Sequence, residues 1–183
     1  MQMTGARILY LSALLFIIGG GASRAGDTGA IALHYGSNTI DFGAGDKPGT
    51  AVLAHRENFN AHGFDVLTVY LADWQLISVF DSDKEALLLT AGGGADCMLH
   101  DFRLVRDRDG AVRLVVAERD FGDGYADTAP VRFKFYALRR NTAGDVGYPT
   151  AYFQLTGRSV AKKSYCDVGE AFMEDLHIGP YRP

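Results

Sequence analysis

The chain has 183 residues, 48% of them hydrophobic and 22% charged, and a formal net charge of −4 at pH 7. This composition is typical of a globular protein with one buried core. The mildly acidic balance argues against nucleic-acid binding, and the scattered lysines and arginines argue against an electrostatic membrane anchor.

Residues 1–25 have the pattern of a secretory signal peptide. Arg7 precedes an apolar run over residues 8–18, and small residues stand at Ser23 and Ala25. A positive end, a short apolar segment and small residues at the cleavage site define such peptides. The run is well short of the roughly 20 apolar residues that span a membrane. We therefore predict cleavage after Ala25, a single β-rich domain over 26–183 without a stable membrane anchor, and a periplasmic or secreted location.

The chain has two cysteines, Cys97 and Cys166. An exported protein reaches an oxidising compartment, where such a pair forms a disulfide. A zinc site is not indicated, because neither cysteine belongs to a C-x-x-C or Cys-His pattern. A bridge closing a loop of about 70 residues stabilises a fold by roughly 4 kcal/mol on chain-entropy grounds. We predict a Cys97–Cys166 disulfide.

Most of the mature chain has the pattern of β-strands. We expect an irregular lead-in over 26–63, with one or two edge strands, and a strand core over 64–157. The core strands are predicted from β-branched and aromatic runs separated by Asp- and Gly-rich turns. They cover residues 64–71, 74–80, 85–90, 97–105, 111–118, 131–138 and 148–156.

One helix is predicted over 167–178, at the C-terminal end. Asp167 and Glu170 form a capping-box-like start, and Gly179-Pro180 ends the helix. The fold class that follows is mainly β, either an antiparallel β-sandwich or a strongly curved sheet, with one C-terminal α-helix. An open sheet of that size would otherwise expose an apolar face.

Motifs for nucleophilic or metal-dependent catalysis are incomplete. Ser159-Val160-Ala161-Lys162 fits the S-x-x-K pattern of serine β-lactamases, but the S-D-N and K-T-G elements are missing. Histidines at 34, 55, 62, 100 and 177 form no H-x-H or H-E-x-x-H pattern. We therefore predict a non-enzymatic protein with no catalytic residues, no metal site and no cofactor.

The segment 118–127 is the candidate ligand-binding loop. Its residues of interest are Glu118, Asp120, Asp123, Tyr125 and Asp127. The carboxylates offer hard oxygen ligands for calcium, or a pair with mutually shifted pKa values for acid–base chemistry. The alternative is a solvated loop that uses Asp and Gly for its turns. Loops on β scaffolds often carry function, so binding is favoured over catalysis if the site exists.

Three segments resemble the CarG-like family of exported proteins associated with carbapenem resistance. They are residues 94–102, 116–127 and 165–172, and the resemblance extends over about 64–176. It implies a periplasmic protein that protects against a β-lactam without being a recognised β-lactamase. The resemblance implies no catalytic residues that can be placed on this chain.

Three functions remain open. The first is an exported, non-enzymatic protective or binding protein that acts on a β-lactam or on the cell-wall machinery. The second is an extracytoplasmic protein-interaction module, such as a peptidase inhibitor. The third is an unrecognised hydrolase that uses Asp120 and Asp123. The expected partners are therefore a β-lactam or a periplasmic protein, and not a nucleic acid.

Overall fold

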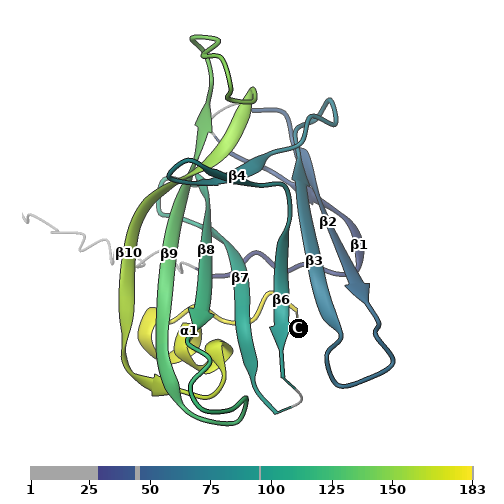
Figure 1. The fold of residues 1–183 in the computed structure, drawn as a ribbon. Helices are drawn as coiled ribbons and strands as arrows, with labels where there is room; N and C mark the ends of the chain where they lie inside the picture. The colour runs from purple at the N-terminus through teal and green to yellow at the C-terminus, as the bar shows by residue number, and fades with distance from the viewer. Residues whose placement is uncertain (1–28, 44–45, 95, 183) are drawn as a thin grey trace, which may run out of the picture.

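The computed structural model describes residues 29–43, 46–94 and 96–182 (Figure 1). The predicted signal peptide lies outside these residues. Within them, no helix is long and apolar enough to cross a membrane.

The described chain forms a ten-stranded sheet and one helix, α1 (Val168–Leu176). The strands are β1 (Gly36–Ile40), β2 (Gly49–Arg56), β3 (Phe64–Tyr70), β4 (Ser78–Asp81), β5 (Lys84–Ala86), β6 (Leu89–Gly93), β7 (Met98–Arg106), β8 (Val112–Arg119), β9 (Ala129–Arg140) and β10 (Ala151–Tyr165). They lie in the order β1-β2-β3-β6-β7-β8-β9-β10-β4-β5. All neighbours are antiparallel except β4, which runs parallel to β10 through Ser78 and Tyr152.

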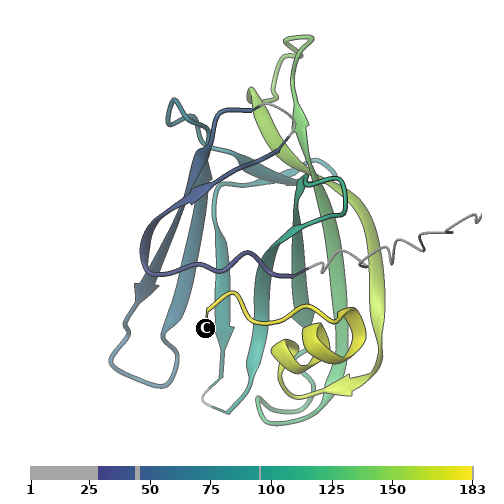
Figure 2. The ribbon, with the colours of Figure 1, turned by 180° about the vertical axis from the view of Figure 1, so that it is seen from behind.

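The sheet is strongly curved and is not closed (Figures 1 and 2). Leu53 on β2, Phe102 on β7 and Phe153 on β10 are fully buried in one core cluster, so strands from both halves of the sheet pack on each other. A flat open sheet of this size would expose its apolar face to solvent, and the curvature of this sheet buries that face instead. The mainly β prediction is confirmed, whereas a sandwich of two separate sheets is not.

The strand boundaries differ from the predicted ones toward both ends of the described chain. β1 and β2 lie in the lead-in, where one or two edge strands were expected, but β2 is an inner strand that pairs with β1 and, from Thr50 to Arg56, with β3. The buried side chains of β2 at Ala51 and Leu53 are few and one is small, so the apolar signal is weak. At the other end, β10 continues past residue 157 to Tyr165, because an exposed polar strand lacks an apolar pattern.

Two predicted core strands also begin later or break. The segment 74–80 becomes a strand only at Ser78, because Trp74 adopts a φ of 64° in a turn. The segment 85–90 divides into β5 and β6. Gly93 extends β6 along β7, where a Cβ would lie 2.5 Å from the Leu99 nitrogen, so this close approach requires glycine.

Helix α1 packs over one end of the sheet, against β7, β8 and β10 (Figure 2). Asp167 is its N-cap and accepts a hydrogen bond from the Gly169 nitrogen at 2.6 Å, as predicted. His177 adopts a left-handed conformation, with a φ of 55°, and ends the helix before residue 178. Val168 and Phe172 pack on β8 and β9 residues in a second buried cluster.

The N-terminal segment 29–35 and the C-terminal segment 178–182 run side by side across the face of the sheet that is turned to the viewer in Figure 2. The Ile31 nitrogen donates to the Leu104 carbonyl of β7 at 2.7 Å. The Leu33 nitrogen donates to the Tyr181 carbonyl at 2.7 Å, and the Tyr181 ring stacks on Phe102 with a centroid distance of 4.9 Å. The two ends of the described chain are thus fastened to β7 and to each other.

Candidate functional site

The carboxylates of the segment 118–127 are not gathered into an acidic cluster. Glu118, on β8, lies 3.0 Å from the Lys134 ammonium of β9, which also lies 3.2 Å from Asp81. Asp120 forms an ion pair with Arg132. Burial alone lowers the pKa of Lys134, but its contacts with Glu118 and Asp81 raise that pKa above its usual range. Two cations from the neighbouring strand β9 therefore neutralise the two carboxylates nearest the sheet.

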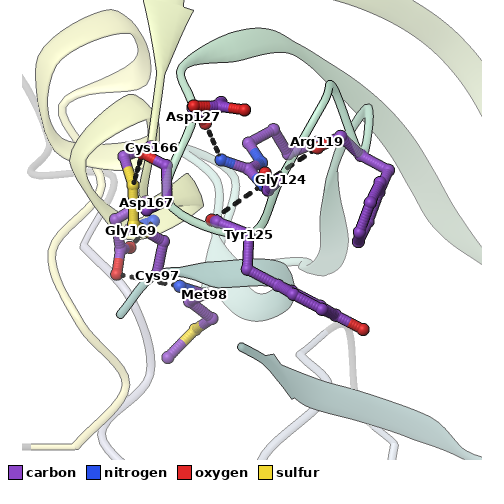
Figure 3. The surroundings of a disulfide bond; sticks show 11 residues. Cys97, Met98, Arg119, Gly124, Tyr125, Asp127, Cys166, Asp167 and Gly169 are labelled. Atoms are coloured by element: carbon purple, nitrogen blue, oxygen red, sulfur yellow. Dashed lines mark hydrogen bonds between the residues drawn. A yellow bond between two sulfur atoms is a disulfide. The ribbon is translucent and has the colours of Figure 1, made fainter. Parts of the chain in front are cut away.

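Arg119, which the sequence analysis did not single out, organises the loop. Its buried guanidinium donates to the carbonyls of Asp127, Tyr125 at 3.0 Å and Gly124 at 3.3 Å (Figure 3). These are oxygens of the kind that calcium binds, and the guanidinium already uses them. In the parts of the chain that the structure describes, no group of three or more His, Cys, Asp or Glu could hold a metal ion.

Of the remaining loop residues, Asp123 and Asp127 are exposed, and only Tyr125 faces a cleft. The Tyr125 ring lies 4.7 Å from Phe121 and 5.8 Å from His62, measured between centroids. With His100 it lines a cleft of about 300 Å³. Burial lowers the pKa of His100, and the charge of Glu118 opposes this shift. The loop thus presents one aromatic ring to a small cleft instead of a carboxylate pair.

The predicted disulfide is present and lies beside this loop (Figure 3). Cys97 and Cys166 join the turn before β7 to the residue that precedes the helix cap, with their Cα atoms 5.6 Å apart. The Asp167 carboxylate accepts hydrogen bonds from the Gly169 nitrogen and, at 3.2 Å, from the Met98 nitrogen. One covalent bond and one shared carboxylate therefore attach α1 to β7.

The S-x-x-K motif lies on a strand. Ser159 and Lys162 are exposed residues within β10. A serine nucleophile of this class stands instead at the start of a helix in a pocket, with its lysine one helical turn away. The structure therefore does not give Ser159 the surroundings that the motif requires.

A cleft of about 600 Å³ lies where the two crossing segments meet β7. Leu33, Met98 and Pro180 supply apolar walls, and Arg103 and Arg182 supply positive charge. We refer to it as the crossing cleft. Sequence reasoning missed it because its walls come from three distant parts of the chain.

A buried ion pair forms the floor of the crossing cleft. The side chains of Asp101 and Arg103, on β7, are 1% and 4% exposed and are joined through Arg103 Nη1. Arg103 Nε also donates to the Gly179 carbonyl at 2.8 Å, and the guanidinium lies over the rings of Phe172 and Tyr181. Burial raises the pKa of Asp101 above its usual range, and the charge of Arg103 opposes this shift only in part.

Asp65, on β3, is a second buried carboxylate beside the cleft. It accepts hydrogen bonds from the hydroxyls of Tyr181 at 2.7 Å and Tyr35 at 3.0 Å. The ring of His55 lies 2.9 Å away, and Arg182 Nε lies 3.4 Å away. Burial alone raises the pKa of Asp65, but these partners together lower it below its usual range.

Comparisons with known proteins agree with this fold. A solved structure described as "Crystal structure of CarG" superimposes with a TM-score of 0.68 at 23% sequence identity, covering 79% of this chain and 94% of that one. That likeness shows a common fold. A search of curated protein sequences found no match. The family model "Carbapenem resistance protein CarG-like" matches residues 33–174, which is most of the described chain. The protein is therefore a member of the CarG-like family of carbapenem resistance proteins.

Proposed function

We propose that this protein is an exported, non-enzymatic protein that protects against a carbapenem by binding the intact antibiotic. The observation that carries the proposal is the crossing cleft, which has the volume of a small-molecule site, apolar walls and two arginines. A carbapenem is a compact bicyclic molecule with one carboxylate. Arginine is the side chain best suited to hold a carboxylate, and the apolar walls suit the ring system.

Several features support binding over turnover. Ser159 stands on an exposed strand, and Asp120 is engaged by Arg132. A general acid–base pair needs carboxylates whose environments push their pKa values apart at one reaction centre. Glu118 and Asp120 are each held by a separate cation instead. The third function of the sequence analysis, hydrolysis by Asp120 and Asp123, therefore has no support from their surroundings.

Export is supported by two independent features. The N-terminal 25 residues have the pattern of a signal peptide. The structure also contains a disulfide between Cys97 and Cys166, and such bonds persist in oxidising compartments. We propose that the protein meets its ligand outside the cytoplasm.

The test is a thermal-shift titration of the purified, oxidised protein with imipenem, followed by mass spectrometry of the drug. Binding to the native state alone raises the melting temperature by mass action, so we expect a dose-dependent rise and an unchanged drug mass. Alkali-opened imipenem is the control for the intact lactam ring. The absence of any shift would overturn the binding function, and accumulation of hydrolysed drug above a protein-free control would overturn the non-enzymatic one.

A specific surface also favours the second function, an interaction module. β5 is the last strand of the sheet, and Leu87 and Leu88 directly after it are about half exposed. An unpaired strand edge is the usual place for a partner to add a strand. If a protein partner binds there, substituting both leucines by serine will abolish its binding and leave the thermal shift with imipenem unchanged.

A further inference from the structure

Arg103 has a hydrogen-bond donor that the described protein does not use. Its Nε donates to Gly179, and its Nη1 donates to Asp101 and to the Phe102 carbonyl at 2.7 Å. Among the described residues, Nη2 has no hydrogen-bond partner. The side chain as a whole is almost entirely buried, but Nη2 is not among the fully buried atoms that lack a partner, so this nitrogen still reaches the surface. The free edge of the guanidinium is therefore available to an acceptor from outside the chain.

Arg103 is also held in a fixed position. The Phe172 ring lies 4.5 Å and the Tyr181 ring 5.1 Å from the centre of its guanidinium. These rings and the hydrogen bonds leave the side chain little rotational freedom. A donor that is already oriented loses little entropy when a ligand binds, which favours affinity.

The acceptors beside the crossing cleft are already in use. Asp101 accepts from its neighbour Phe102 through one oxygen and from Arg103 through the other. Asp65 is engaged by tyrosine hydroxyls on both of its oxygens. Arg182, at the rim, uses Nε toward Asp65 and Nη1 toward the Tyr35 hydroxyl, which leaves its Nη2 available. The donors that remain unused in the cleft are cationic, so they favour a ligand that supplies an anionic acceptor.

We propose that the crossing cleft binds a small carboxylate with an apolar body. The carboxylate accepts hydrogen bonds from Nη2 of Arg103 and from Arg182, and the apolar body packs on Leu33, Met98 and Pro180. The identity of the natural ligand as a carbapenem rests on the proposed function. The site itself, with its carboxylate chemistry, rests on the unused donors and the walls described above.

The experiment is a calorimetric titration of the purified, oxidised protein with three probes. Benzoate supplies a carboxylate on an apolar ring, benzyl alcohol supplies a similar ring without the charge, and imipenem is the proposed ligand class. We expect benzoate and imipenem to bind, and benzyl alcohol to bind at least tenfold more weakly. That contrast measures the contribution of the charge-assisted hydrogen bonds.

Three variants place the binding at this site. Arg182→Gln removes the rim charge, His34→Trp fills the cleft from an exposed position, and Asp101→Asn with Arg103→Met removes the buried pair without leaving a lone charge. Each should weaken benzoate and imipenem binding at least tenfold. The matched control is Asp107→Asn with Arg113→Met, which removes an Asp–Arg pair outside the cleft and should bind as the wild type does.

The outcomes separate this inference from the proposed function. Imipenem binding that all three cleft variants retain would overturn the site and leave the function standing. Benzoate binding that the variants abolish, without imipenem binding, would support the site and overturn the function. Equal binding of benzoate and benzyl alcohol would overturn the carboxylate chemistry. Failure of benzoate and imipenem alike to bind the wild type would overturn both proposals.

Discussion

Arg119 stabilises the loop that follows β8 by binding its carbonyl oxygens. Replacing it with alanine leaves these oxygens without their donor, and the guanidinium no longer fills the centre of the loop. We expect Arg119→Ala to lower the free energy of unfolding by about 3 kcal/mol, measured by urea denaturation, since it removes several hydrogen bonds from a charged donor. Arg108→Ala, at an exposed turn, is the control and should have almost no effect.

Amide hydrogen exchange provides the local readout for Arg119. We expect faster exchange at the Asp127 amide, which donates to the Gly124 carbonyl, in Arg119→Ala, and the exchange of β2 amides should be accelerated only by the global loss of stability. A loop that keeps its native protection without the guanidinium would contradict this account of Arg119.

Asp65 makes stability dependent on acid pH. Its folded pKa lies below the unfolded value of about 3.9, so the stability it contributes is present above that value and is lost as the pH falls through the folded pKa. We expect Asp65→Asn to cost about 2 kcal/mol at pH 6. The difference from the wild type should shrink as the pH falls below about 4. A difference in urea-unfolding free energy that is constant between pH 6 and pH 2 would contradict this.

For single residues, the sequence predicted the chemical type of a site residue better than it predicted which residues surround it. Asp167 was predicted as a helix cap from its pattern with Glu170, and the prediction succeeded because the contact of a cap is local: the observed donor, Gly169, lies two residues away. The loop carboxylates were identified by type, but the cations that neutralise them, Lys134 and Arg132, lie on β9. Knowing those partners requires the strand register, which a single sequence does not contain.

The disulfide joins two elements, the β6–β7 connection and the start of α1. Because it closes a long loop, we expect reduction to lower the free energy of unfolding by about 4 kcal/mol on chain-entropy grounds. Urea denaturation with and without dithiothreitol measures this loss. The variant with both cysteines replaced by alanine should respond to urea identically in the two buffers, and an equal stability of oxidised and reduced wild type would refute the prediction.

The elements themselves were only partly predictable. Strands with strong apolar or alternating patterns, such as β3, β7 and β9, were found near their observed positions. The parallel pairing of β4 with β10 was not predicted, because the short turns between successive strands indicated antiparallel pairing throughout the sheet. Composition likewise left the choice between a sandwich and a curved sheet open, since both bury the same apolar residues.

At the scale of the whole molecule, Tyr181 connects the C-terminal segment to two distant strands, β7 and β3. Its ring is buried against Phe102 and Arg103, and its hydroxyl donates to Asp65. We expect Tyr181→Ala to cost about 4 kcal/mol through the cavity it leaves. Tyr181→Phe keeps the ring and should lose about 2 kcal/mol, from the hydrogen bond alone.

Thermal and urea denaturation of the two Tyr181 variants distinguish packing from hydrogen bonding. Equal destabilisation by alanine and phenylalanine would mean that the hydroxyl alone matters. No destabilisation by either would mean that the C-terminal segment is not part of the cooperative fold.

The strand order has a consequence for the time course of folding. β4 leaves the ribosome early, yet its neighbour β10 is among the last segments made. The same holds for Cys97 with Cys166 and for Asp65 with Tyr181. Contacts between distant segments form slowly, because the entropy cost of closing a long loop precedes the favourable energy of the contact. The nascent chain therefore lacks these long-range contacts until its last residues have been synthesised. A chaperone that prevents its aggregation has to act over that whole interval.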